Sequence, residues 1–111
     1  MYYELSKSQK KIAHIVMDKG LDNHYKKALT DAESIIDMWH EGKLESLRDA
    51  YMKLWASINK NDSKIARIYN DKGGSRWVEI MALQLRDGAI TIDDLRDFDE
   101  EVRDIIIGWS R

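Results

Sequence analysis

The chain has 111 residues, of which 43% are hydrophobic and 34% charged, and it contains neither cysteine nor proline. These values are typical of one globular domain over residues 1–111, and they exclude disulfides, thiolate metal sites and cysteine nucleophiles. The net charge of -2 gives no overall attraction to nucleic acid. The sequence shows neither a membrane-spanning run nor a secretion signal. We therefore expect a cytoplasmic protein without membrane contact.

The first part of the chain predicts two helices, over residues 6–19 and from Asp22 or Asn23 to Glu41. Gly20 followed by Leu21 is typical of a helix C-terminus, and Gly42 is expected to end the second helix. The second helix has the most regular apolar stripe in the chain, which predicts that it faces the core. The stripe consists of Leu21, Tyr25, Ala28, Leu29, Ala32, Ile35, Ile36 and Trp39.

A third helix is predicted to begin at Ser46, because Asp49 follows three residues later in the spacing of an N-terminal cap. Its apolar residues recur at intervals of three and four: Leu47, Ala50, Tyr51, Leu54, Trp55 and Ile58. The polar run 59–62 is predicted to break this helix, and a shorter fourth helix is expected over residues 63–70. The tryptophans at 39, 55, 77 and 109 are assigned to the core.

The segment 75–86 is apolar around most of its circumference when drawn as a helix, and this pattern is typical of a buried helix. Gly73 and Gly74 precede it, and Ser75 can serve as its N-cap. We therefore expect the other helices to pack around this segment.

In the C-terminal part, Thr91 and Asp94 have the spacing of an N-terminal cap, which predicts a single helical turn that continues through Arg96. A last helix is expected to follow, capped by Asp97 or Asp99. No stretch alternates long enough to predict a sheet. The sequence therefore predicts an all-α fold: a single-domain bundle of five to seven helices with short loops around a buried central helix at about 75–86.

A basic segment at 64–76 is the candidate site for an anion or nucleic acid. Glycines before a helix N-terminus let phosphate oxygens approach free backbone N–H groups, and nearby cations add attraction. The residues concerned are Lys64, Arg67, Lys72, Gly73, Gly74, Ser75 and Arg76. The segment lacks the complete order of a nucleotide-binding loop and its basic excess is modest, so an ordinary connection between helices is the favoured interpretation.

Metal and catalytic sites find little support in the sequence. Asp37, His40 and Glu41 resemble half of a metal site in a helical bundle, but no second such cluster occurs. A calcium-type loop ending at Asp94 would need carboxylates where Leu83 and Leu85 stand. We expect the three histidines to be ordinary solvated residues, and we expect no metal, no cofactor and no enzymatic activity.

Charge is distributed unevenly along the chain: residues 1–27 carry six lysines, whereas residues 87–104 carry eight acids. These two segments could face each other within one molecule or between two. Residues that fall outside the apolar stripes, or at the basic end, are the candidate interface: Tyr2, Tyr3, Lys7, Lys10, Lys11, Met38 and Met52. The leading hypothesis is a small non-enzymatic interaction or regulatory module that binds another protein or itself, and nucleic acid is the less favoured partner.

Overall fold

A computed structural model describes residues 3–70, 73 and 76–111. In this part of the chain it contains four α-helices, a 3-10 turn at Asp93–Leu95 and no strand. These elements are α1 (Lys7–His40), α2 (Leu47–Tyr69), α3 (Trp77–Arg86), η2 (Asp93–Leu95) and α4 (Glu100–Ser110). The all-α fold is confirmed, but the expected five to seven helices around a central one are not found, because two predicted breaks do not occur.

The first absent break is at Gly20, where α1 continues without interruption for 34 residues. Gly20 is buried, and a Cβ atom built on it would lie 2.3 Å from Nε2 of Gln84 in α3. Glycine therefore serves a close helix–helix contact here and does not end the helix. The helix begins at Lys7 and is capped by Ser6, whose Oγ accepts a hydrogen bond from the Gln9 amide at 3.3 Å. The predicted end at Gly42 is confirmed by its positive φ of 72°.

The second absent break is at residues 59–62, which lie within α2. Asn61 donates a side-chain hydrogen bond to Asp31 of α1 at 3.0 Å, so part of the polar run stabilises contact between the two helices. The predicted start of α2 is confirmed: the Oγ of Ser46 accepts a hydrogen bond from the Asp49 amide at 3.0 Å.

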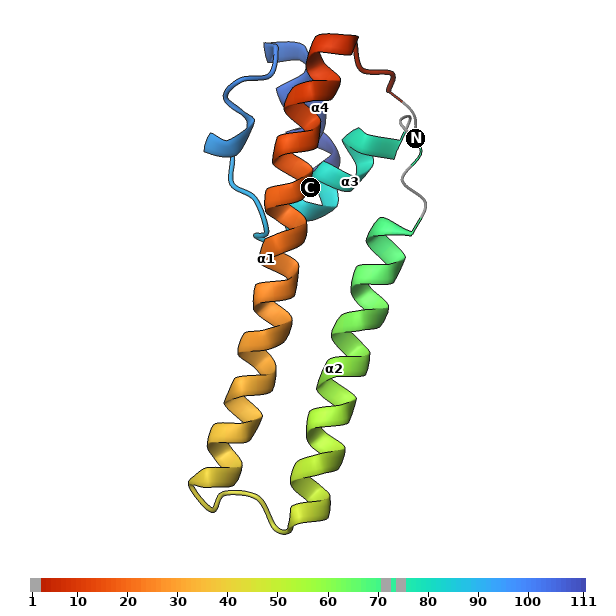
Figure 1. Ribbon diagram of the computed structural model, residues 1–111. Coiled ribbons are helices and arrows are strands. Elements are labelled where there is room, and N and C mark those ends of the chain that lie inside the picture. The colour runs from red at the N-terminus through yellow and green to blue at the C-terminus, as the bar shows by residue number, and fades with distance from the viewer. Residues whose placement is uncertain (1–2, 71–72, 74–75) are drawn as a thin grey trace.

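The molecule is elongated, measuring 54 Å along its longest axis and 25 and 23 Å across. Figure 1 shows that α1 and α2 lie antiparallel and project away from the smaller helices. We call residues 25–67, which form this two-helix hairpin, the arm. The head consists of residues 3–24 together with the described residues from 68 onward. Almost the whole hydrophobic core lies in the head, so the molecule is not a bundle wrapped around its centre.

Helix α3 supplies much of the core of the head. Val78, Ile80 and Met81 are completely buried, against Ala13 and Val16 of α1 among others. The burial expected for this segment is thus found, although the helix begins at Trp77 and the proposed cap Ser75 lies outside the described residues. Trp77 and Trp109 pack against the same core.

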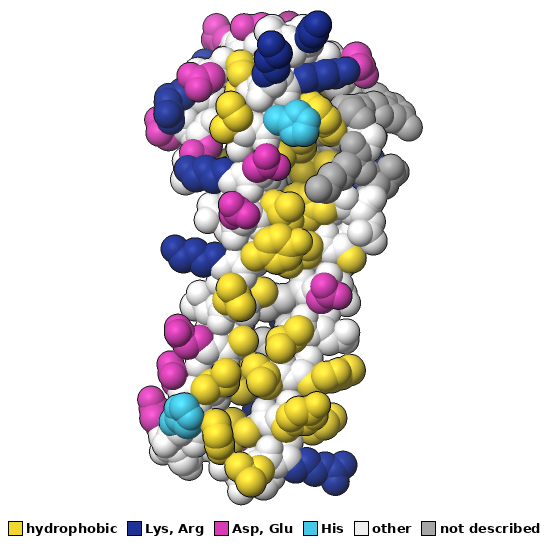
Figure 2. All heavy atoms as spheres, viewed as in Figure 1, with side chains coloured by type: hydrophobic (Ala, Val, Ile, Leu, Met, Phe, Trp, Pro, Cys, Tyr) yellow, Lys and Arg dark blue, Asp and Glu magenta, His cyan; other side chains and the backbone are white. Residues whose placement is uncertain are grey.

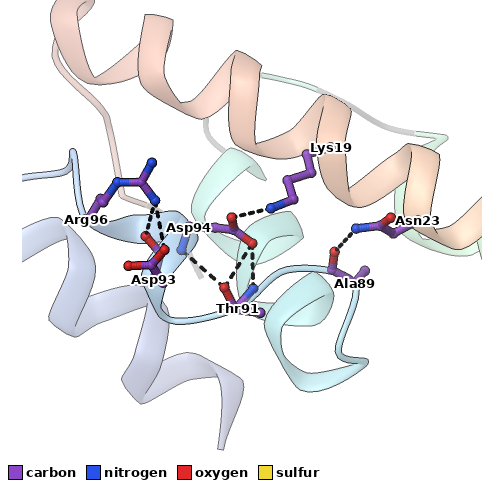
Figure 3. A network of polar contacts seen from close by, with 7 residues as sticks. All are labelled: Lys19, Asn23, Ala89, Thr91, Asp93, Asp94 and Arg96. Atoms are coloured by element: carbon purple, nitrogen blue, oxygen red, sulfur yellow. Dashed lines mark hydrogen bonds and ion pairs between the residues drawn. The ribbon is translucent and has the colours of Figure 1, made fainter.

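The segment that connects α3 to α4 is tied to α1 by polar contacts (Figure 3). The Asp94 carboxylate accepts hydrogen bonds from the Thr91 amide at 2.8 Å and the Thr91 hydroxyl at 3.1 Å, which confirms the capping pattern expected there. Lys19 pairs with Asp94, and Asn23 donates to the Ala89 carbonyl at 2.7 Å. One lysine of the basic segment therefore meets the acidic segment within the same molecule.

Candidate functional site

The main candidate site is a continuous apolar surface on the arm, which we call the arm face. Figure 2 shows apolar side chains running down both helices of the arm on the side toward the viewer. The large residues that form it are Tyr25, Leu29, Ile36 and Trp39 of α1 and Leu47, Tyr51, Trp55 and Ile58 of α2.

The assignment of these residues to the core is wrong for the chain as it stands in the structure. Leu29 is 71% exposed, Leu47 72% and Tyr51 68%. The physical reason is the length of α1. Helix α3 packs only against the half of α1 that lies in the head, and in the arm the neighbour of α1 is α2. Two helices cover one side of each other and leave the adjacent stripe of both in solvent.

A groove of about 310 Å³ crosses the arm face near its tip. Ile36 and Trp39 from α1 and Leu47 and Tyr51 from α2 form its walls, and the half-buried Leu54 lies between them. All the residues that line the groove are apolar or aromatic: Ile35, Ile36, Trp39, Leu47, Ala50, Tyr51 and Leu54. Such a surface can bury the apolar side chains of another helix, and the Trp39 indole N–H and the Tyr51 hydroxyl are the polar side-chain groups among its lining residues.

The arm-face residues, taken together with two half-buried residues of the seam, follow the pattern of helix packing. With the half-buried Ala32 included, positions 25, 29, 32, 36 and 39 of α1 alternate steps of four and three residues. With the half-buried Leu54 included, positions 47, 51, 54 and 58 of α2 do the same, and Trp55 lies beside them. This is the periodicity by which helices pack along their length in coiled coils and bundles. Each arm helix therefore carries one stripe toward its neighbour and an adjoining stripe toward solvent.

The opposite side of the arm is polar and has its own internal contacts. Lys27 pairs with Asp31 at 2.8 Å and Lys53 with Asp49 at 3.1 Å. Hydrogen bonds from Lys27 and Asn61 hold the pKa of the Asp31 carboxyl below its ordinary value. The arm thus has one apolar side and one side with charged residues.

The structure does not bring the interface residues expected from sequence onto one surface. Tyr3 packs against the core of the head, Lys10 pairs with Glu4 at 3.1 Å, and Lys7 and Lys11 are exposed near the start of α1. Met38 and Met52 are exposed near the arm tip, but neither lines the groove. With a rise of 1.5 Å per residue, Lys11 and Met38 are about 40 Å apart along α1. Tyr2 lies outside the described residues.

The candidate anion site is only partly described. Lys72, Gly74 and Ser75 lie outside the described residues, and Gly73 is exposed. Of the cations, Lys64 lies 3.4 Å from the carboxylate of Asp87, and Arg76 forms an ion pair with Glu79 at 3.2 Å. Arg67 is exposed on α2. Because carboxylates already partner two of these cations, no observation favours this segment over the arm face, and anion binding stays a prediction.

A buried polar network joins α1, α2 and α3 where the arm meets the head. The amide of Gln84 donates to the Met17 carbonyl at 3.0 Å and to the Tyr69 hydroxyl at 2.9 Å. Tyr69 contacts Nδ1 of His24 at 2.6 Å, and Nε2 of His24 contacts Asp87 at 3.2 Å. In the neutral form of the imidazole with its proton on Nε2, Nε2 donates a hydrogen bond to the carboxylate and Nδ1 accepts one from the tyrosine hydroxyl; in the protonated form both ring nitrogens donate. Burial raises the pKa of the Tyr69 hydroxyl.

This network corrects the expectation of solvated histidines, since His24 is only 7% exposed. The two other histidines are exposed, and His14 makes an edge contact with the Trp77 ring. Across the described residues, no group of three or more histidine, aspartate or glutamate side chains is placed to hold a metal ion. The network fixes the base of the arm and has a structural role.

Sequence reasoning identified the arm-face residues as apolar and helical but did not identify them as a surface. The available signal was the width of the stripe on residues 21–39, which spans up to half of the helix circumference and exceeds what one neighbouring helix can cover. No helix within the described residues has the length and apolar character needed to cross a bilayer. Comparison with protein-family models, curated proteins and solved structures finds no match for this chain.

Proposed function

We propose that this chain is a small, non-enzymatic interaction module that binds another protein through the arm face. The observation that carries the proposal is the exposure of eight large apolar side chains on one side of a two-helix arm. At about 200 Å² per large side chain, their exposed fractions amount to roughly 900 Å². The largest apolar patch on a typical monomer is about 300–600 Å².

The chemistry of the surface defines the partner it fits. The 4-3 spacing and the apolar groove suit helices that present apolar residues every third and fourth position. The aromatic residues Tyr25, Trp39, Tyr51 and Trp55 are the side-chain types that contribute most to binding energy at protein interfaces. A regulatory role would follow from occupation of this surface, and we expect the protein to act in the cytoplasm.

The test compares two variants that carry identical charge changes on opposite sides of the arm. Leu29→Glu with Tyr51→Glu places two carboxylates in the arm face. Ser34→Glu with Ala56→Glu places two carboxylates five residues further along the same helices, about 140° around each. All four positions are exposed, so both variants are expected to keep the helix content of the wild type, measured by circular dichroism.

The readout is quantitative mass spectrometry of whatever remains bound to an affinity-tagged chain, including untagged copies of itself. We expect the main bound protein to be retained by the wild type and the far-side variant, and to fall by more than tenfold for the arm-face variant, because each charge prevents burial of a large apolar group. Equal retention by the arm-face and far-side variants would overturn the proposal.

A further inference from the structure

We infer that the protein bound by the arm face is a second copy of this chain, and that the two arms close face to face into a four-helix bundle. This inference rests on the proposed function and adds the identity of the partner. Its first support is shape: the arm is one layer of two antiparallel helices with an apolar seam on one side. A second copy supplies a layer of the same length and spacing, which is what a four-helix bundle requires.

The charged groups in and beside the arm face provide the second support. On α1, Lys26 lies toward the head, Asp37 lies toward the tip, and the exposed Glu33 lies between them. On α2 the order of the charges is reversed, with Asp62 toward the head and Arg48 toward the tip. The Asp31–Asn61 hydrogen bond joins the two helices close to the level of Asp62. At 100° per residue, Lys26, Asp37 and Arg48 project beside the apolar stripes, and Asp62 projects within the stripe of α2, between the directions of Tyr51 and Trp55.

This arrangement of charges is self-complementary. A two-fold axis along the arm brings Lys26 of one copy to Asp62 of the other and Asp37 to Arg48. A two-fold axis across the arm brings Lys26 to Asp37 of the other copy and Arg48 to Asp62. Either way, each of the two cations lies toward a carboxylate of the other copy, and Glu33 is the one carboxylate of the set with no cation opposite it. The opposite charges favour association of two copies over repulsion.

Each of the four charged residues that meet in this way is exposed and available for such a contact. Among the described residues, Lys26, Asp37, Arg48 and Asp62 have no side-chain hydrogen bond or ion pair. On the far side of the arm, Lys27 pairs with Asp31 and Lys53 with Asp49.

The area of the arm face supports a stable dimer. Its roughly 900 Å² per copy is close to the about 800 Å² that each partner contributes to a standard protein interface. In a two-fold arrangement the same apolar surface is used in both copies, so the arm face of one copy covers that of the other.

The test uses two charge variants of the full chain and measures mass by sedimentation equilibrium from low to high micromolar concentration. Lys26→Glu with Arg48→Glu makes all of these charges acidic; Asp37→Lys with Asp62→Lys makes all of them basic except Glu33. We expect the wild type to form a dimer, each variant alone to dissociate at least tenfold more readily, and the equimolar mixture of the two variants to dimerise again. Restoration in the mixture shows that neither variant failed by unfolding.

A wild type that is monomeric over the whole range, or a mixture that stays monomeric, would overturn the inference. If the wild type is monomeric while an arm-face-dependent partner of different sequence is captured, only the second-copy inference fails. If the variant Leu29→Glu with Tyr51→Glu still dimerises, the dimer does not use the arm face and the inference is wrong. If that variant also keeps every captured partner, the proposed function fails as well.

Discussion

At the scale of single residues, the contact between Gly20 and Gln84 allows α1 to pass directly over α3. Gln84 is completely buried, and both donors of its side-chain amide are used, on Met17 and Tyr69. Its Oε1 atom has no hydrogen-bond partner within the described residues and lies 2.9 Å from where a Cβ on Gly20 would stand. The glutamine thus fits against the bare backbone of Gly20 and cannot withdraw without losing its hydrogen bonds.

We therefore expect Gly20→Ala to destabilise the protein by about 2 kcal/mol, because overpacking of a close contact costs about 1–3 kcal/mol. In an open helix the same change would stabilise by up to about 1 kcal/mol. Gly108 of α4 provides that comparison, because nothing lies within 4 Å of a Cβ built on it. Urea unfolding of both variants measures the difference. A Gly20→Ala variant as stable as Gly108→Ala would contradict the close packing described here.

The same contact explains why the sequence predicted a helix end at Gly20. A glycine followed by leucine is a common C-terminal signal, and glycine inside a helix normally costs stability. The need for glycine arises from Gln84, which is 64 residues away in the chain, so no local pattern could reveal it. The polar run 59–62 was misread for a similar reason, since Asn61 is paired with Asp31 across the arm.

At the scale of elements, η2 and the loop before it are attached to α1 mainly through Asp94. The ion pair with Lys19 and the hydrogen bonds from Thr91 hold the pKa of the Asp94 carboxyl below its ordinary value. A carboxyl whose pKa is lower in the folded than in the unfolded state stabilises the fold above its unfolded pKa. This contribution disappears as the pH falls through the folded pKa, so the wild type should lose stability in acid, below about pH 4.

We expect Asp94→Asn to lower the free energy of unfolding at neutral pH by about 1 kcal/mol, the usual cost of a lost capping or paired group. Its stability should then fall less steeply than that of the wild type as the pH is lowered. The matched control is Asp93→Asn, which removes an exposed ion pair with Arg96 at 2.9 Å and should change stability little. Thermal unfolding of the wild type and the two variants across the acid range measures how stability depends on pH. Parallel curves of stability against pH for the wild type and Asp94→Asn would contradict the stabilising role of the Asp94 carboxylate.

Sequence periodicity predicted which segments are helical better than it predicted what each helix packs against. The caps at Ser46 and Thr91 and the burial of Val78, Ile80 and Met81 follow from local chemistry or from apolar residues on all sides of a helix. The width of the stripe on residues 21–39 indicates more apolar surface than one neighbouring helix covers. A stripe does not show what covers it, so periodicity alone does not predict whether the arm face is buried or exposed. Leu29 and Leu54 have the same chemistry, yet only the second is half-buried by the neighbouring helix.

At the scale of the whole molecule, the head and the arm depend on different sources of stability. The head has its own core, in which residues of α1, α3 and α4 are completely buried. The arm has one interhelical seam and exposes more large apolar residues than it buries. A hairpin of this kind gains little from intramolecular burial, so closing two arms together would add stability mainly to the arm.

This difference predicts a thermal midpoint that depends on protein concentration. Binding of a second copy to the folded state stabilises the folded state by mass action. Each tenfold rise in protein concentration raises the free energy of unfolding by about 1.4 kcal/mol of dimer. For a unit of this size we expect the midpoint of the wild type to rise by about 3 °C per tenfold increase. Leu29→Glu with Tyr51→Glu should show a lower midpoint that is independent of concentration, whereas Ser34→Glu with Ala56→Glu should keep the wild-type slope. Because a monomer unfolds at the same temperature at any dilution, a flat wild-type curve would show that the arm gains no stability from a second copy.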